Sequence, residues 1–374
     1  MKLYLQVQEL LSLARDYTHE LSAGVVEVQE GLRLSREITS GLRMQDKRLE
    51  LLSELFQSEL PRYSDVATID AFLFDALRDL FSLHPSNPTF VPLFGCLFRM
   101  LSGEAIDRLH ADCSNQVLVA HVSCRAREDR ARASIHSFPS DLDGTRHLIV
   151  VGDPSHAHGG FSVRYDGERI ELPCRDSYEG HCEKCLHFYA LLSSVSMPRL
   201  VYKLDDDVHL DDSDLFLTHI EDLLSRSIPY AGHVVSGWPH HRQMWHGWHL
   251  GKCLDKTFEA IGCQVPVASA FADGGFGYAL APQALEELSY AFFAHRASLE
   301  VPSIMYEDTT VGLFLQLAGI VPECIDYGAT GLTSERHLMQ LDLHCRWREY
   351  VDYEKRLILS LESHSLWDAF SSHG

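Results

Sequence analysis

The feature of the sequence that most constrains the fold is an alternation of apolar runs and helical pattern that begins at Gln116. The run QVLVAHVSC is followed by the charged helical segment REDRARASIHSF and then by a second apolar run, RHLIVVGD. Strands that alternate with helices in this way are typical of an α/β domain with a largely parallel sheet. The sequence therefore predicts a layered α/β domain over residues 113–374.

The preceding region, residues 1–112, has a different pattern. Apolar side chains recur at spacings of three and four over residues 3–56, which is the seam of a coiled coil or helix bundle. Gly24, Gly31 and Gly41 each weaken a continuous helix by about 1 kcal/mol relative to alanine, so two or three helices are expected. We predict a helical module here that assembles the chain into a homo-oligomer.

Composition excludes some classes of partner. The chain has 374 residues, of which 45% are hydrophobic, enough for one large core or two smaller ones. Its net charge of -21 repels nucleic acid and anionic membranes, so neither is expected as a partner.

The location of the protein is predicted from its first residues and its cysteines. The N-terminal stretch MKLYLQVQELLSLARDYTHELSAG has acidic residues and glutamines within its apolar pattern, so neither a signal peptide nor a transmembrane segment is expected there. The ten cysteines are then expected to stay reduced, as in a cytoplasm. The predicted location is cytoplasmic.

Three adjacent aspartates, Asp205 to Asp207, leave the carboxyl end of the predicted strand LVYKL. Ligands of parallel sheets bind beyond the carboxyl ends of the strands. Because crowded carboxylates in a partly dehydrated place need compensation, this acidic run predicts a divalent metal ion. Lys203, just upstream, either adds positive charge to the site or pairs with the acids.

Spacing separates three kinds of metal site. An EF-hand counted from Asp205 needs glycine at the sixth position and glutamate at the twelfth, where Leu210 and Phe216 stand. An aspartate-nucleophile phosphatase normally has a small hydroxyl residue where His209 stands. The third kind is a nucleotide-sugar site, in which Asp-x-Asp holds Mn²⁺ or Mg²⁺ against a diphosphate. A solvated acidic turn without a ligand is the alternative for an isolated run.

Further motifs flank the acidic run in a definite order. The strand and arginine-rich helix VLVAHVSCRAREDRARASIHSF, the strand LIVVGD and the segment RDSYEGHCEKCLHFYALL precede it, and ADGGFGYALAPQAL and YEDTTVGLFLQLAGI follow it. From about residue 117 to residue 320, roughly half the chain, this order resembles the β-1,3-galactosyltransferases and Fringe-like glycosyltransferases of glycosyltransferase family 31. The resemblance implies the GT-A fold and an inverting transfer from a UDP-sugar.

The resemblance also implies roles for individual residues. Asp207 matches the direct metal ligand, for Mn²⁺ or Mg²⁺, and Asp308 matches the catalytic base that takes the proton of the acceptor hydroxyl. The chain departs from the family at Thr309, where valine is usual. Glu307 and Asp308 would also suit the first turn of the helix VGLFLQLAG as capping acids, so the functional role comes from the resemblance alone.

The resemblance also predicts which residues bind the UDP-sugar donor and which bind the acceptor substrate. The residues predicted to bind the donor are Ser123, Arg127, Arg132, Asp176, Lys184, Asp205, Asp206, Asp273, Gly274 and Gly275. Flat apolar rings suit the faces of sugars, so the segment GWPHHRQMWHGWHLGK predicts an acceptor surface, although its rings would equally suit core packing. The residues predicted to bind the acceptor are Trp238, Trp245, Trp248 and Glu307.

Two further predictions concern histidines and cysteines as metal ligands. Members of the family usually supply a histidine ligand after the acidic helix, and His337 is the predicted one, ahead of His344. The segment HCEKCLH holds His181, His187 and a single Cys-x-x-Cys pair, Cys182 and Cys185, without a second cysteine pair. A structural zinc site is not predicted from it, because the resemblance assigns the segment to a helix under the donor site.

The sequence thus predicts a metal-dependent enzyme that moves a hexose or N-acetylhexosamine from a UDP-sugar to a glycan, glycolipid or protein. Animal members of the family carry an N-terminal membrane anchor, and the helices that replace it here indicate a microbial or viral enzyme at a membrane-bound glycan assembly machinery. The alternative is a non-catalytic sugar-binding or scaffold protein that keeps the fold. A nucleotide-sugar pyrophosphorylase would need a glycine-rich loop, which VLVAHVSCRARED lacks.

Overall fold

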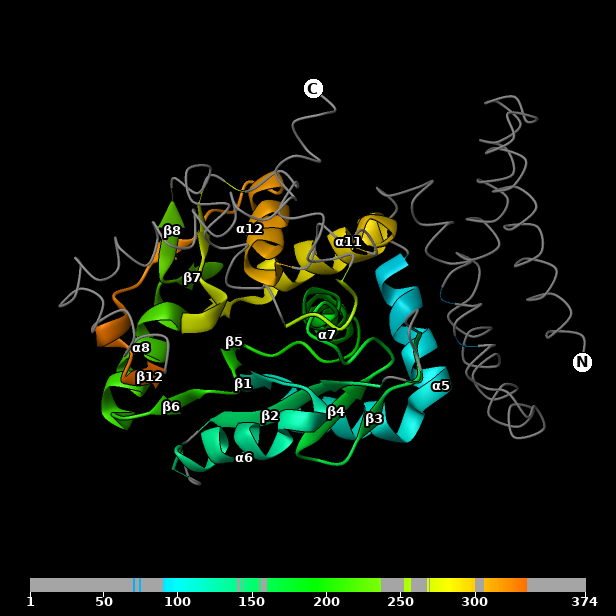
Figure 1. The fold of residues 1–374 in the computed structure, drawn as a ribbon, viewed down its shortest axis with the longest axis horizontal. Coiled ribbons are helices and arrows are strands. Elements are labelled where there is room, and N and C mark those ends of the chain that lie inside the picture. The colour runs from blue at the N-terminus through cyan, green and yellow to red at the C-terminus, as the bar shows by residue number, and fades with distance from the viewer. Residues whose placement is uncertain are drawn as a thin grey trace, which may run out of the picture.

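The computed structural model describes residues 90–139, 144–153, 160–236, 252–256, 270–299 and 306–334, and the single residues Asp70, Phe74, Leu142, Ser155 and Ala268. These residues form an eight-stranded sheet with helices on both faces (Figure 1). Of the predicted N-terminal module, only the helix α5 (Phe90–Cys113) and two single residues are described. Its predicted helices over residues 3–56 lie outside the described residues.

The sheet is mixed and mostly parallel, as predicted, in the order β11-β7-β10-β5-β1-β2-β4-β3. Its strands are β1 (Val117–Val122), β2 (Thr145–Gly152), β3 (Arg164–Tyr165), β4 (Arg169–Leu172), β5 (Leu200–Asp205), β7 (Tyr230–Gly232), β10 (Tyr278–Leu280) and β11 (Glu323–Cys324). The four central strands β5, β1, β2 and β4 are parallel neighbours, whereas β10 is antiparallel to β5 and β7, and β3 to β4. The carboxyl ends of the four parallel strands therefore share one edge.

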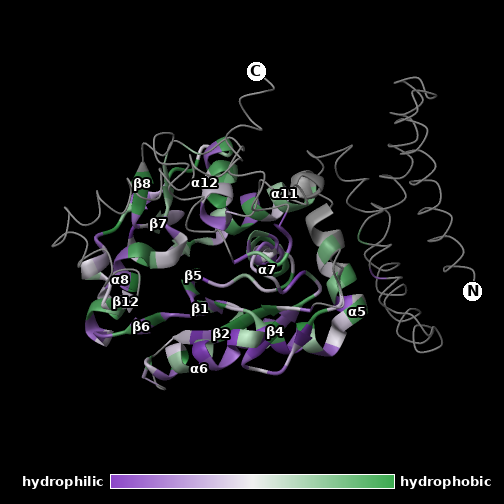
Figure 2. Ribbon diagram, in the orientation of Figure 1, coloured by the Kyte–Doolittle hydropathy of each residue, from purple (hydrophilic) through white to green (hydrophobic). Residues whose placement is uncertain are grey.

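Helices cover both faces of the sheet because the strands are apolar on both sides. On β1, Leu118 and Ala120 join the core with α5, α7 (His181–Val195) and α11 (Pro282–Leu299), whereas Val117 and Val119 pack toward α8 (Ser213–Ser225). The amphipathic helix α6 (Glu128–His136) buries Ala131 against β2 and is otherwise mostly hydrophilic in Figure 2.

Helix α7 lies at the centre of one helical layer (Figure 1) and contacts α5, α11 and α12 (Glu307–Leu317). Nearly all of its residues are buried, as expected for a helix enclosed by others. Phe94 and Phe98 of α5 belong to the same core as α7, so α5 packs as part of the sheet domain. The boundary at residue 112 and the oligomerisation role stay predictions.

Two small ribbons complete the described structure. The strand β6 (Val208–Leu210) pairs with β12 (Leu332–Ser334), and β8 (Val234–Ser236) pairs with β9 (Ala270–Ala272). The pair β6–β12 begins directly after the acidic run and thereby anchors its far end. Among the described helices, none has the length and apolarity that crossing a lipid bilayer requires.

Candidate functional site

The candidate site lies where the central parallel strands end. Asp205 is the last residue of β5, and Asp206 and Asp207 form the turn into β6, so the structure confirms that the acidic run leaves the carboxyl end of a buried strand. Ser123 follows the end of β1 in the neighbouring position of the sheet. The site is therefore built from adjacent strand ends, as the sequence predicts.

Asp206 is the most enclosed member of the acidic run, with 3% of its surface exposed. Its carboxylate accepts hydrogen bonds from Ser123 Oγ at 2.7 Å and from the Arg127 guanidinium at 2.5 Å. Burial raises the pKa of Asp206, and the bond from Ser123 and the charge of Arg127 oppose that rise. Three residues predicted to bind the donor therefore meet, and Asp206 holds Ser123 and Arg127 in place.

Asp207, the predicted metal ligand, is more exposed than Asp206. Its nearest cation is Arg130, whose guanidinium lies 3.3 Å from Asp207 Oδ2. Burial raises the pKa of Asp207, as does the neighbouring carboxylate of Asp205, while Arg130 lowers it. Arg130 was not among the predicted residues, although its spacing of three from Arg127 would have placed both guanidiniums on one side of a helical turn.

Lys203 pairs with the acids. Its ammonium is 1% exposed and lies 2.6 Å from Asp205 Oδ1, 3.1 Å from the Gly274 carbonyl oxygen and 3.3 Å from Glu307 Oε2. Burial alone would lower the pKa of Lys203, but the carboxylates of Asp205 and Glu307 raise it well above its ordinary value. A charged ammonium therefore joins the end of β5 to the start of α12.

Glu307 is enclosed on the same side. It is 5% exposed, and the Tyr278 hydroxyl donates to its Oε1, while Tyr278 is in turn 2.7 Å from the hydroxyl of Tyr189. The pKa of Glu307 is raised to about 7, chiefly by burial, which outweighs the lowering by Lys203 and is aided by the charge of Asp308. Glu307 was predicted to bind the acceptor substrate. In the structure both of its carboxylate oxygens contact partners within the protein.

Asp308, the predicted base, lies in the first turn of α12 and is half-buried. Its Oδ2 accepts from the Gly274 amide at 3.3 Å, and its Oδ1 accepts from the Thr309 amide at 2.8 Å. The residue at the N-cap position is Tyr306, so Asp308 does not occupy it.

The glycine segment approaches these acids closely. A Cβ atom on Gly274 would lie 2.7 Å from Glu307 Oε2 and 3.3 Å from Lys203 Nζ, so only glycine fits there without a shift. Asp273 accepts a hydrogen bond from the Gly275 amide at 2.9 Å and thereby caps the turn η4 (Gly274–Phe276). The segment predicted to line the donor sugar therefore supports the two carboxylates of α12.

Asp176 and Lys184 form a buried support behind the strand ends. Lys184 Nζ donates to Asp176 Oδ1 at 2.7 Å and to the Ser123 carbonyl at 2.5 Å. Asp176 also accepts from the amides of Gly152 at 2.8 Å and Arg125 at 2.7 Å. The pair ties together the ends of β1 and β2, and its predicted contact with the donor stays a prediction.

The structure does not bring every predicted residue to this site. Arg132 bonds to Glu128 at 2.7 Å and also to Glu168, so its guanidinium is engaged on the outer side of α6 rather than with the acidic run. The predicted residues Trp238, Trp245, Trp248 and His337, and the alternative His344, lie outside the described residues.

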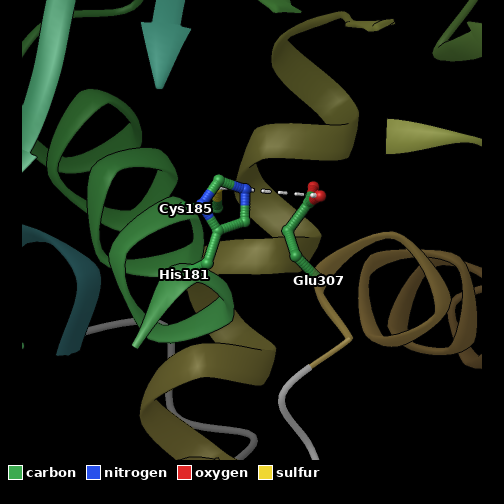
Figure 3. A group of neighbouring side chains, drawn as sticks. All are labelled: His181, Cys185 and Glu307. Carbon is green, nitrogen blue, oxygen red and sulfur yellow. Dashed lines mark hydrogen bonds and ion pairs between the residues drawn. The ribbon is translucent and has the colours of Figure 1, made fainter. Parts of the chain in front are cut away.

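A second group of side chains that could hold a metal ion consists of His181, Cys185 and Glu307 (Figure 3). His181 and Cys185 are one turn apart on α7, and their ligand atoms and a Glu307 oxygen all lie within 4.8 Å of one another. Burial, together with the charge of Lys203, lowers the pKa of His181 to about 3. The sequence analysis had considered His181 and Cys185 together, but it had not predicted that Glu307 lies beside them.

Comparisons with known proteins identify no relative: no family model matches the sequence, and no curated protein matches it significantly. The resemblance to glycosyltransferase family 31 consequently rests on the motifs and their order.

Proposed function

We propose that the chain is a metal-dependent, inverting glycosyltransferase of the GT-A fold, similar to glycosyltransferase family 31, that moves a hexose or N-acetylhexosamine from a UDP-sugar to a glycan, glycolipid or protein hydroxyl. One observation carries the proposal: Lys203 contacts Asp205 and Glu307, and Gly274 contacts both Lys203 and Asp308. The acids of two sequence motifs that are distant in the chain therefore belong to one continuous group.

The acidic run suits a hard divalent ion. Asp205 and Asp207 have 35% and 23% of their side chains exposed, so both offer carboxylate oxygens at the surface of the site. Such oxygens are the ligands that Mn²⁺ and Mg²⁺ prefer. We assign Asp207 as the direct ligand and Asp205 as a group that orients the ion or the donor. An ion bound there would neutralise the charge that develops on the diphosphate as the glycosidic bond breaks.

The arginines beside the run suit the diphosphate itself. Arg127 and Arg130 have 48% and 35% of their side chains exposed while contacting Asp206 and Asp207. Guanidinium groups bind phosphate oxygens with paired N–H donors, and partly exposed ones can exchange a carboxylate for a ligand at little cost. Asp206, fixed by Ser123, then positions Arg127 rather than contacting the donor.

Asp308 supplies the proton acceptor. As the acceptor oxygen attacks C1 of the sugar, the bond from C1 to the diphosphate oxygen breaks and the hydroxyl proton passes to the Asp308 carboxylate. The Gly274 amide, 3.3 Å from Asp308 Oδ2, holds that carboxylate in place. Glu307 is the less suitable base, because it is 5% exposed and is held by Tyr278 and Lys203. We assign it to positioning, through Lys203, rather than to proton transfer.

The alternative is a sugar-binding or scaffold protein without turnover. Release of UDP from a panel of UDP-hexoses and UDP-N-acetylhexosamines, with Mn²⁺ and with EDTA, separates the two. We expect release from one donor class, its loss with EDTA, and its loss in Asp207→Ala with the fold retained. Metal-dependent UDP binding by calorimetry without UDP release from any donor, even with mixed oligosaccharide acceptors, would support the scaffold alternative.

A further inference from the structure

Three side chains with different ligand atoms converge from α7 and α12, as Figure 3 shows for His181, Cys185 and Glu307. We propose that His181, Cys185 and Glu307 bind a borderline-soft divalent cation such as Zn²⁺. This site is separate from the carboxylates of Asp205 and Asp207 that we assign to Mn²⁺ or Mg²⁺, and it does not depend on the proposed transferase activity.

The spacing of the ligand atoms suits a tetrahedral ion. His181 Nε2 lies 3.8 Å from Cys185 Sγ and 3.9 Å from the nearer Glu307 oxygen. Tetrahedral Zn²⁺ with ordinary bond lengths places a nitrogen about 3.6 Å from a sulfur and about 3.3 Å from an oxygen. The remaining pair, Cys185 Sγ and a Glu307 oxygen, lies within 4.8 Å, where tetrahedral Zn²⁺ needs about 3.5 Å, so the group has to close by at most roughly 1.3 Å. The His181 side chain is 27% exposed, which leaves it room to move and opens a path for the ion.

The kinds of ligand favour zinc over the ions of the acidic run. A thiolate, an imidazole and a carboxylate are a common set for Zn²⁺, whereas Mg²⁺ and Mn²⁺ favour oxygen ligands. A water molecule would complete the coordination as the fourth ligand. Binding deprotonates the Cys185 thiol, and the proton leaves to solvent.

Glu307 is already oriented for this role. The Tyr278 hydroxyl donates to Oε1, and the other oxygen, Oε2, is the one near His181. Hydrogen bonds of this kind to the free oxygen of a ligating carboxylate fix its orientation in metal sites. The Tyr189 hydroxyl, 2.7 Å from that of Tyr278, extends the support to the same helix that carries the other two ligands.

Lys203 is the cation that the ion would compete with. It lies 3.3 Å from Glu307 Oε2, but it also contacts Asp205 at 2.6 Å and the Gly274 carbonyl at 3.1 Å. Loss of one of these three contacts leaves the ammonium paired. Zinc would therefore replace a single contact of Lys203 and join α7 to the first turn of α12.

A role as a reactive free thiol does not explain Cys185. The side chain is fully buried, and burial raises its pKa well above the ordinary value, so without a metal the thiol stays protonated and inert. Cys182, three residues earlier on the same buried helix, is outside the group of three ligands. It offers a matched control for the loss of a buried thiol.

The test uses the full chain, stripped with a chelator and titrated with Zn²⁺ against a chromophoric competitor and, separately, with Co²⁺. We compare the wild type with Cys185→Ser, His181→Gln and the control Cys182→Ser. The proposal expects one tight zinc equivalent, and a thiolate-to-cobalt charge-transfer band, in the wild type and the control. Both are lost in Cys185→Ser, and His181→Gln weakens zinc binding at least tenfold.

The chain has 22 histidines, and zinc could bind to some of them elsewhere. The variants are therefore needed to assign the bound zinc to this site. Equal zinc content in the wild type and Cys185→Ser, or a charge-transfer band that survives in Cys185→Ser, overturns the proposal. If Cys185→Ser does not fold, His181→Gln decides in the same assay, since its partly exposed side chain tolerates replacement. The readouts need no sugar donor, so failure here is distinct from failure of the transferase proposal.

Discussion

The acidic run is compensated in two different ways on its two sides. On one side, which we call the arginine side, Asp206 and Asp207 contact Arg127 and Arg130, which have 48% and 35% of their side chains exposed. On the other, the lysine side, Lys203 and Glu307 are enclosed by the helices, and Asp205, with 35% of its side chain exposed, is the one partner of Lys203 near the surface among the residues of this set. The same three adjacent charges are thus met by exposed guanidiniums at one end and by a buried ammonium at the other.

The lysine side is built from residues that are far apart in the sequence. Lys203 is 1% exposed and contacts Asp205, Glu307 and the carbonyl of Gly274. Tyr278 donates to the remaining oxygen of Glu307. Removal of Lys203 would leave the Glu307 carboxylate buried without its cation.

The two sides differ in how easily a ligand can replace their ion pairs. The pair of Arg130 and Asp207 is partly exposed, and exposed ion pairs contribute about 0–1 kcal/mol, so a diphosphate or metal ion can replace that contact at little cost. Breaking a buried pair costs about 3–5 kcal/mol, so the lysine side acts as a fixed frame. We infer that donor exchange takes place on the arginine side and that the lysine side keeps Asp308 in position.

The largest expected effect comes from Asp308, which the fixed frame holds. Asp308→Asn keeps an oxygen for the Gly274 amide, so the thermal unfolding midpoint and calorimetric UDP binding with Mn²⁺ should change little. Turnover should fall by about 10²–10⁴, as expected for the loss of a general base. Retention of more than a third of the wild-type rate would remove the catalytic role of Asp308.

Lys203→Met tests the lysine side directly. The variant leaves Glu307 buried without its cation, and the free energy of unfolding should fall by about 3–5 kcal/mol. Urea denaturation followed by circular dichroism measures the loss. The double variant Lys203→Met/Glu307→Gln should recover part of it, because the buried charge is also gone. Equal losses in the single and double variants would show that the two charges are not coupled.

The layers of the fold were predictable because their signals are local. Apolar runs and a helical period gave β1, α6 and β2 in the right order, and the strand before the acidic run is β5. The insertion of β10 between β5 and β7 was not predictable. A strand of three residues, Tyr278–Leu280, carries too little pattern, and its antiparallel pairing depends on contacts distant in sequence.

The site was predictable only as far as its residues are neighbours in sequence. The run Asp205 to Asp207 at a strand end follows from the sequence, whereas the split between Arg130 and Lys203 as partners depends on how α6 and α12 pack. The pair His181 and Cys185 shares one face of a predicted helix. Its meeting with Glu307 is a consequence of helix packing, which composition and spacing do not encode.

The arginine side also rests on a titratable support. Ser134 donates to the Val208 carbonyl directly after the acidic run, and His121 contacts Ser134 at 2.9 Å and His147 at 3.2 Å. Burial lowers the pKa of His147 to about 4 and that of His121 well below its ordinary value, with neighbouring cations and His147 adding to the shifts.

This support predicts an acid-sensitive stability. Below about pH 6.5 the unfolded chain takes up protons that the folded chain excludes, so stability falls as the pH drops from 6.5 toward 4. Between pH 7.5 and pH 5 the contribution of His147 should be of the order of 2 kcal/mol. Urea denaturation at both pH values should show a smaller fall in His147→Gln and an unchanged fall in the exposed control His136→Gln. The same fall in both variants would rule out His147 as the cause.

The smallest expected effect is on the arginine side itself. In Arg130→Gln the Asp207 carboxylate stays partly exposed to water, so the free energy of unfolding should change by less than about 1 kcal/mol, and less still in 1 M salt. The affinity for UDP with Mn²⁺ should nevertheless fall, because a guanidinium that we assign to diphosphate binding is lost. Urea denaturation and calorimetry measure the two effects on the same sample. A stability loss near that of Lys203→Met would show that Arg130 belongs to the fixed frame, and the two sides would then no longer differ.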